Sequence, residues 1–265
     1  MTADGGFATG EPEQTAVRSV PGGPGGQGRA RRRLRDAGVI LVAAVASALL
    51  LRTFVLEALR VPSRSMEPSL LPGDFVIVSK LPFARPGRGE VFAFRFPSGV
   101  DSPHAEVVFV KRCIAVPGDS VEVTDGMIRV NGVQADPPGM VASGAGLPPG
   151  LAGVHRTWVI PRPGEEIALS DSLLPRWHAL IEREGHRVAT GPSGDVLLDG
   201  TPATSYRVER RHYFVAGDNR TDSFDSRFWG LLPEDAVLGK AILIYWSWDS
   251  GLSAVRWGRL GALVR

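Results

Sequence analysis

Short runs of apolar and β-branched residues, separated by turn residues, dominate the chain after residue 53. Runs of three to six residues with this composition are typical of β-strands. The clearest runs span 75–78, 91–94, 107–110, 121–123, 127–130, 213–216 and 241–246. The pattern therefore predicts a mostly β fold, and the hairpin signals between runs favour antiparallel sheets.

Two dipeptides predict tight hairpins, because Asn-Gly and Asp-Gly readily adopt the positive φ angles that such turns need. They are Asn131-Gly132, after the run 127–130, and Asp199-Gly200, after the run 196–198. One stretch, 172–184, has helical spacing instead, with Ser170 or Asp171 as its expected cap. Its apolar face is predicted to consist of Leu173, Leu174, Trp177, Leu180 and Ile181.

The N-terminal part has a different pattern. Residues 1–35 are rich in Gly, Pro and small polar residues and end in an Arg cluster, which predicts a disordered basic tail. An apolar stretch follows, and we expect residues 36–53 to form a transmembrane anchor whose Arg-rich side is cytoplasmic. The uncharged core, 37–51, is short for a spanning helix. A cleaved signal peptide and a buried helix of a soluble protein are the competing interpretations.

Composition excludes several classes of function. The formal net charge of +2 is too small to indicate a nucleic-acid partner. A single cysteine, Cys113, rules out an intrachain disulfide framework and a Cys-rich zinc site. None of the five histidines has another at the i, i+4 spacing of a helical metal site.

Three segments contain the residues that suggest chemistry: 61–74, 110–119 and 217–230. Taken singly, each has an ordinary explanation. The first can be a Ser-rich turn. The second can be an apolar strand with a lysine at its end, whose charge reaches solvent. The third can be an Asx-rich loop with an internal ion pair.

Together and in this order, the three segments closely resemble the signature boxes of bacterial type I signal peptidases. The resemblance begins at Arg52 and covers nearly all of the chain beyond it, and the segment 158–206 looks like an insertion found in some members. It implies an antiparallel β-sheet catalytic core formed by 54–132 and 212–265, with a small lobe, 133–211, inserted between them.

The resemblance also implies a Ser/Lys pair, with Ser65 as nucleophile and Lys111 as general base. The Ser63 hydroxyl and the Ser65 backbone N–H would form the oxyanion hole. A lysine can act as a base only when neutral, and an apolar setting favours the neutral amine. The adjacent Arg112 offers a control if its side chain is merely a surface cation.

Further residues of the third segment take supporting roles by the same resemblance. Ser223 would orient the Lys111 amine, Asp225 and Arg227 would form a structural ion pair, and Asp218 would support the site. One departure is Arg64, which lies between the two serines where many members have a small residue. Its side chain must point to solvent or to the membrane surface.

The resemblance implies a membrane-bound endopeptidase that works through an acyl-enzyme, without cofactor or metal. Its partners would be exported preproteins with small residues at −1 and −3, membrane lipid and the nearby protein export machinery, and not nucleic acid. The enzyme would cross the cell membrane once, with its N-terminus cytoplasmic and its catalytic domain outside. A catalytically silent paralogue and a repressor-type Ser/Lys protease are the rivals, although no helix-turn-helix is visible before Ser65.

Overall fold

A computed structural model describes residues 35–47, 49, 55–81, 85–96, 107–135, 151 and 153–265. The chain divides into two compact units, residues 1–49 and 50–265. The predicted tail up to residue 34, the far end of the predicted anchor and residues 136–150 lie outside the described residues.

The first unit contributes helical residues, 35–47 and 49. Its large apolar side chains are exposed, from 51% for Val45 to 69% for Val42. In the part of the chain that the structure describes, no helix combines the length and apolar character needed to cross a membrane.

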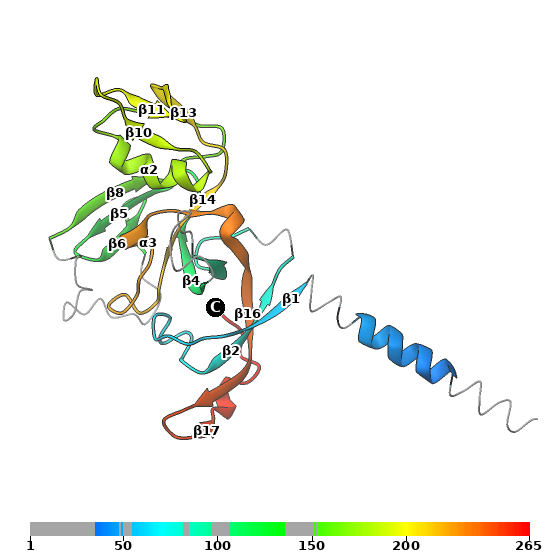
Figure 1. Cartoon of the computed structure of the whole chain (residues 1–265). Helices are drawn as coiled ribbons and strands as arrows, with labels where there is room; N and C mark the ends of the chain where they lie inside the picture. Colours follow the sequence, from blue (N-terminus) through cyan, green and yellow to red (C-terminus); the bar gives the residue numbers. More distant parts are fainter. Residues whose placement is uncertain are drawn as a thin grey trace, which may run out of the picture. The chain divides into compact units, whose positions relative to one another are not determined.

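The second unit is built on one large antiparallel sheet, which confirms the predicted mostly β fold (Figure 1). Its strands run in the order β1-β2-β16-β3-β4-β14-β15, and β17 pairs with β16. Their bounds are β1 Leu56–Arg60, β2 Asp74–Ser79, β3 Val91–Arg95, β4 Val108–Ala115, β14 His212–Ala216, β15 Leu232–Pro233, β16 Val237–Asp249 and β17 Ala254–Val255.

Alternation of side chains explains why these segments form strands around a core. In β2, Val76 and Val78 are fully buried while their neighbours are partly exposed, as the period of two along a strand requires. The two valines pack with Met66 and Leu70 from the loop that joins β1 to β2. The core therefore fixes this loop as well as the sheet.

A second sheet has the order β7-β6-β5-β8 and follows β4 in the chain. Its strands are β5 Ser120–Thr124, β6 Met127–Val130, β7 Val133–Gln134 and β8 His155–Val159. Asn131 and Gly132 join β6 to β7 with φ angles of 51° and 80°, which confirms the predicted hairpin. β8 belongs to the predicted inserted lobe but pairs with β5 of the predicted core, and that division of the chain stays a prediction.

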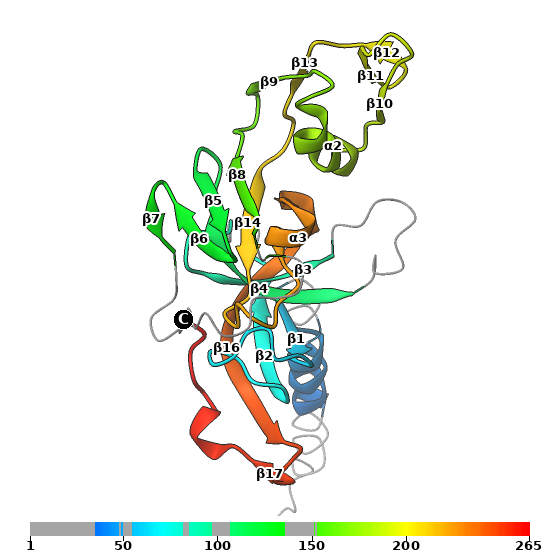
Figure 2. The same cartoon turned by 90° about the vertical axis from the view of Figure 1, so that its left-hand side faces the viewer.

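Smaller elements gather at the end of the unit opposite β17, as two views show (Figures 1 and 2). Two small sheets, β10-β11-β12 and β13-β9, lie there with α2. The bounds are β9 Glu166–Ala168, α2 Leu174–Arg183, β10 Val188–Thr190, β11 Val196–Leu198, β12 Thr201–Pro202 and β13 Ser205–Arg207. The remaining helices are α3 Ser226–Trp229, η1 Glu234–Ala236 and η2 Trp257–Arg259.

The helix α2 corrects two details of the sequence prediction. It begins at Leu174, and its N-cap is Leu173, which has no side-chain cap. Leu173 is 37% exposed and does not belong to the buried face. The expected cap Ser170 accepts a hydrogen bond from the Leu173 N–H, before the helix starts. Ser170 therefore closes the preceding turn.

Candidate active site

The loop 61–73, here called the Ser65 loop, joins β1 to β2. Its ends are tied together by hydrogen bonds from Val61 N to Asp74 O, 2.8 Å, and from Gly73 N to Val61 O, 2.9 Å. Gly73 has φ +91°, and a Cβ at this position would overlap the Trp248 carbonyl oxygen of β16. The base of the loop is thus closed on itself and pressed against the neighbouring strand.

The structure brings Ser65 and Lys111 together, although they lie 46 positions apart. The Nζ atom of Lys111, on β4, is 2.6 Å from the Oγ atom of Ser65. The side chains of both residues are buried, with Lys111 only 2% exposed. Such a separation allows direct proton transfer between the two groups.

Burial lowers the pKa of Lys111 from 10.5 to about 8, because removing the ammonium from water disfavours its charged form. The carboxylate of Asp225 acts in the opposite direction, and the guanidinium of Arg227 adds to the lowering. A substantial fraction of the amine is therefore neutral near pH 8, as a general base requires.

Two donors lie beside the Ser65 hydroxyl. The exposed Ser63 places its Oγ 3.1 Å from the Oγ of Ser65. The Ser65 backbone N–H has no hydrogen-bond acceptor among the described residues. Both groups are thus available as donors next to the Ser65 hydroxyl, and their role as an oxyanion hole stays a prediction. The Arg64 side chain between them is 70% exposed and pairs with Glu67, so it does point away.

The third segment holds the Ser65 loop from the opposite side. Asn219 donates its backbone N–H to Ser65 O at 3.0 Å and its side-chain amide to Arg64 O at 3.2 Å. At Gly217, a Cβ would overlap both the Ser65 carbonyl oxygen and the Ser223 hydroxyl. Sequence reasoning gave neither Gly217 nor Asn219 a role. The sequence signal that could have indicated these roles was the Gly-x-Asn pattern formed by Gly217 and Asn219.

Asp225 and Arg227 form the expected ion pair, with Nε–Oδ1 and Nη2–Oδ2 distances of 2.8 and 2.9 Å. Both side chains are fully buried. Burial alone would raise the pKa of Asp225, but the hydrogen bonds and charge of Arg227 outweigh it and lower this pKa. Asp225 also accepts from the Gly217 N–H at 3.0 Å, so the pair fixes the start of the third segment.

Ser223 lies buried between these groups. Its hydroxyl makes no hydrogen bond to the Lys111 amine and helps instead to lower the pKa of the adjacent Asp225. Its orienting role toward Lys111 stays a prediction.

Arg112 is not a surface cation, which corrects the sequence expectation. Its side chain is 9% exposed and forms a bidentate pair with Asp218, at 2.8 Å (Nε–Oδ1) and 2.6 Å (Nη2–Oδ2). Its Nη1 donates to Gly89 O, and Nη2 lies 3.3 Å from the Oγ of Ser69 in the Ser65 loop. Arg112 and Asp218 thus join β4, the third segment and the Ser65 loop.

Other reactive side chains are poorly suited to catalysis or metal binding. Burial raises the pKa of the Cys113 thiol to about 12, so it is not a ready nucleophile. Within the described ranges, no group of three or more His, Cys, Asp or Glu side chains is placed to hold a metal ion.

Comparison with known proteins identifies the family. A model described as "Signal peptidase, peptidase S26" matches residues 34–246. The chain belongs to the signal peptidase family S26. It is thus a protease of the signal peptidase I kind, and all the site residues above lie within the matched range.

Two relatives that are named signal peptidase I support the assignment. The chain is 30% identical over 226 residues to a signal peptidase I of Pseudomonas aeruginosa, covering 76% of this chain and 68% of that protein. It is 33% identical over 219 residues to a signal peptidase I of Aquifex aeolicus, covering 77% and 80%. A solved signal peptidase I of Enterococcus faecalis is 20% identical, with a TM-score of 0.30, over 59% of this chain and 96% of that one.

Proposed function

We propose that the protein is a membrane-bound serine endopeptidase that removes N-terminal signal peptides from exported preproteins with a Ser/Lys pair. The observation that carries the proposal is the 2.6 Å contact between Lys111 Nζ and Ser65 Oγ in a buried setting. The membership in family S26 supports the substrate class.

In the proposed reaction, neutral Lys111 accepts the proton of the Ser65 hydroxyl as Ser65 Oγ attacks the scissile carbonyl carbon. The Ser63 hydroxyl and the Ser65 N–H donate to the resulting oxyanion. The protonated Lys111 then gives its proton to the departing amine, and an acyl-enzyme ester remains. Water attacks this ester with Lys111 again as the base, which releases the signal peptide and restores Ser65.

Charged neighbours keep this machinery in place. Asp225 and Arg227 neutralise one another in the fully buried wall beside Lys111, and Asp218 does the same with Arg112. Ser223 is proposed to orient the Lys111 amine. Its buried hydroxyl lies next to Asp225, whose charge also acts on Lys111, and this supports the role.

We expect small side chains at positions −1 and −3 of the substrate. An extended peptide points these two side chains the same way, because strand side chains alternate with a period of two. A site that accepts Ala at −1 rejects Leu by steric overlap. A model preprotein with Leu at −1 should therefore remain uncut while the Ala parent is cleaved, and equal cleavage of both would refute this specificity.

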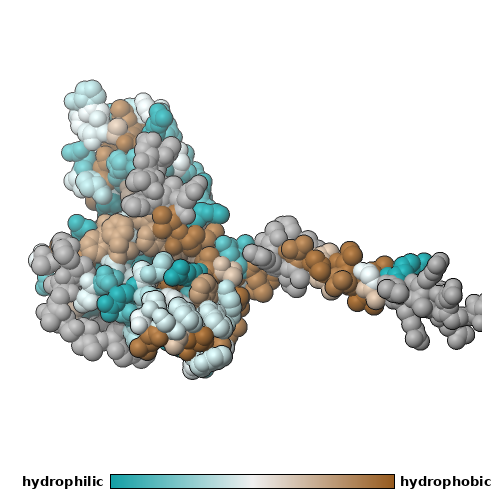
Figure 3. All heavy atoms as spheres, turned by 60° about the horizontal axis from the view of Figure 1, so that its bottom comes forward, coloured by the Kyte–Doolittle hydropathy of each residue, from teal (hydrophilic) through white to brown (hydrophobic). Residues whose placement is uncertain are grey.

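Residues 36–53 are proposed as a single membrane anchor with a cytoplasmic N-terminus. The Arg-rich flank in the sequence and the exposed apolar side chains of the helical residues support this, and Figure 3 shows the helical stretch as mainly hydrophobic. Protease added to spheroplasts should digest the region after Ser65 and spare the N-terminal tail. The opposite pattern would invert the topology.

The deciding experiment is cleavage of a labelled preprotein in detergent by the full chain and by Ser65→Ala. The variant loses only the attacking oxygen, so it should fold normally and show no cleavage. Ser172→Ala is the matched control, because Ser172 is an exposed serine outside the site. Cleavage by Ser65→Ala at the parent rate would place the nucleophile elsewhere.

A further inference from the structure

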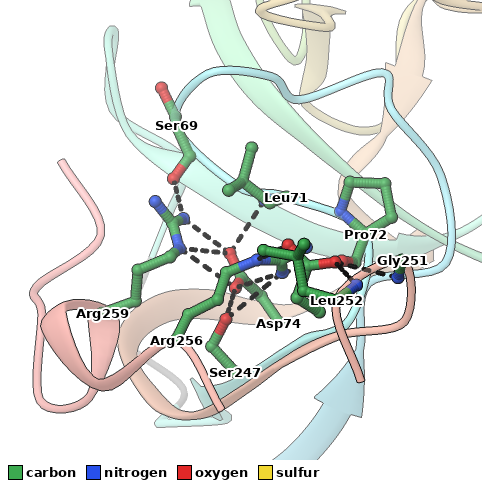
Figure 4. Close-up of polar contacts among 10 residues, drawn as sticks. Ser69, Leu71, Pro72, Asp74, Ser247, Gly251, Leu252, Arg256 and Arg259 are labelled. Atoms are coloured by element: carbon green, nitrogen blue, oxygen red, sulfur yellow. Dashed lines mark hydrogen bonds and ion pairs between the residues drawn. The ribbon is translucent and has the colours of Figure 1, made fainter. Parts of the chain in front are cut away.

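A buried carboxylate lies beneath the Ser65 loop. Asp74, the first residue of β2, is fully buried and accepts hydrogen bonds from Leu71 N at 2.8 Å and from Ser247 Oγ at 2.6 Å. Arg259, from η2, places its Nη2 atom 2.6 Å from Asp74 Oδ2 (Figure 4). A second guanidinium, that of Arg256, lies farther off, with its Nη1 atom 4.0 Å from Asp74 Oδ1, and donates to Pro72 O at 3.0 Å. A buried charge needs such partners, so Asp74 holds the Leu71 N–H, the Ser247 hydroxyl and the Arg259 guanidinium in place.

Arg259 links the Ser65 loop to the buried carboxylate of Asp74. The same Nη2 atom that pairs with Asp74 also donates to the Ser69 carbonyl oxygen at 2.9 Å. The Nε atom adds contacts of 3.1 and 3.2 Å to the Asp74 carboxylate. A planar guanidinium can span a carboxylate and a carbonyl at once, which a lysine ammonium cannot do with the same geometry.

Ser69 is held from a second direction by the neighbour of Lys111. The Nη2 atom of Arg112 lies 3.3 Å from the Ser69 hydroxyl, while Arg259 holds the Ser69 carbonyl. Ser69 is therefore fastened between the C-terminal segment and β4, the strand that carries Lys111. A shift of Ser69 would move the loop relative to Lys111.

The C-terminal segment is itself firmly attached to the sheet. Leu263 pairs with Leu243 of β16, and Ala262 and Val264 pack against the core cluster that contains Met66 of the Ser65 loop. The backbone around Arg259 is therefore held in a fixed position on the sheet. The family match ends at residue 246, so Ser247 and Arg259 lie beyond the part of the chain that resembles the family model.

We propose that Arg259 is a positioning residue that sets the place of Ser65 against Lys111 by holding Asp74 and Ser69. This inference rests on the proposed function, in which the Ser65–Lys111 contact is the reacting pair. Misplacing a reacting group by about 1 Å can cost roughly 100-fold in rate, even when the altered residue does not touch the substrate.

The test compares Arg259→Ala and Arg259→Lys with Arg183→Gln in steady-state cleavage of a labelled preprotein by the full chain in detergent. Arg183 is the control, since it also donates to two backbone carbonyls, Trp229 O at 2.7 Å and Leu231 O at 2.8 Å. These lie at the C-terminal end of the third segment and just beyond it, and not in the Ser65 loop. Arg259→Ala should lower kcat about 100-fold with KM within roughly twofold. Arg259→Lys should fall between it and the parent, and Arg183→Gln should keep the parent kcat.

Hydrogen exchange gives a readout that does not depend on activity. Peptides covering the Ser65 loop should exchange faster in both Arg259 variants and at the parent rate in Arg183→Gln. If Arg259→Ala folds too poorly to assay, Arg259→Lys decides the question. Parent kcat with unchanged loop exchange in either folded Arg259 variant would overturn the inference.

The two proposals fail in different ways. Cleavage by Ser65→Ala at the parent rate would defeat the proposed function, whatever Arg259 does. An inactive Ser65→Ala together with a fully active Arg259→Ala would defeat the positioning role alone. Equal kcat losses in Arg259→Ala and Arg183→Gln, with equal losses of thermal stability, would likewise overturn it in favour of a general effect on folding.

Discussion

The two faces of β4 carry consecutive buried cations in contrasting surroundings. Lys111 donates to a neutral hydroxyl, Ser65, and faces apolar neighbours such as the Phe109 ring, whose centroid is 5.8 Å from its Nζ. Arg112 points to the other face, as strand alternation requires, and forms a bidentate pair with Asp218. Burial therefore favours the neutral form of Lys111, while the charge of Arg112 is balanced by the carboxylate of Asp218. Lys111 is thus suited to act as a base, and Arg112 is suited to hold the structure together.

The largest effect is expected from Lys111→Arg, which tests the role of Lys111 as a base. The guanidinium keeps the positive charge but does not deprotonate in proteins, so no base remains beside Ser65. We expect preprotein cleavage to fall by about 1000-fold or more, measured as kcat/KM. Substantial cleavage by this variant would eliminate the Ser/Lys mechanism.

On the opposite face, Arg112→Met should lower the free energy of unfolding. It leaves the Asp218 carboxylate buried without its partner, which typically costs about 3–5 kcal/mol of the free energy of unfolding. Urea denaturation of the variant measures the loss, with Arg129→Met on the exposed side of β6 as the control. A loss of less than about 1 kcal/mol would mean that the pair contributes little beyond a surface salt bridge.

Lys111→Met should change stability in the other direction. The pKa of Lys111 falls from 10.5 to about 8 on folding, so the buried ammonium destabilises the folded state by about 3 kcal/mol at pH 7. This destabilisation is fully present below pH 8 and disappears as the pH rises to 10.5. The variant should therefore gain up to about 3 kcal/mol over the parent at pH 7, and little at pH 10.5. A variant less stable than the parent at pH 7 would contradict the unfavourable burial of the charge.

The mildest test varies only the pH. If neutral Lys111 is the base, the parent kcat/KM should rise about tenfold per pH unit below pH 8 and level off above it, near the lowered pKa of this lysine. Arg112→Lys should keep the same midpoint, because it alters the other face of the strand. A midpoint above 10 would place the base in a solvated setting.

Local patterns predicted β2, β3, β5, β6 and β14 well, since each of these runs is decided by its own alternation and turns. They did not predict β1, β8, β9 or β10, which are short and lack a distinctive apolar run. The hairpin at Asp199-Gly200, with φ angles of 49° and 83°, followed from the dipeptide alone. The start of α2 was placed too early because helical spacing continues through Leu173, and sequence does not show where the buried face begins.

Contacts between distant positions were beyond such reasoning. The resemblance to known boxes brought Ser65 and Lys111 together, but the apolar strand gave no sign that Arg112 would find Asp218, 106 positions away. The pairing of Arg259 with Asp74 spans 185 positions and joins two segments that are each unremarkable in sequence. Only the order of the strands in the sheet brings these partners within reach.

The buried Cys113 has a practical consequence for spectroscopy. Burial raises the pKa of its thiol to about 12, so the thiol stays protonated at pH 7, and the side chain is fully covered. Maleimide dyes and nitroxide spin labels should therefore leave the native chain unmodified. A cysteine introduced at an exposed position such as Ser172 can then carry a single label without any change to β4.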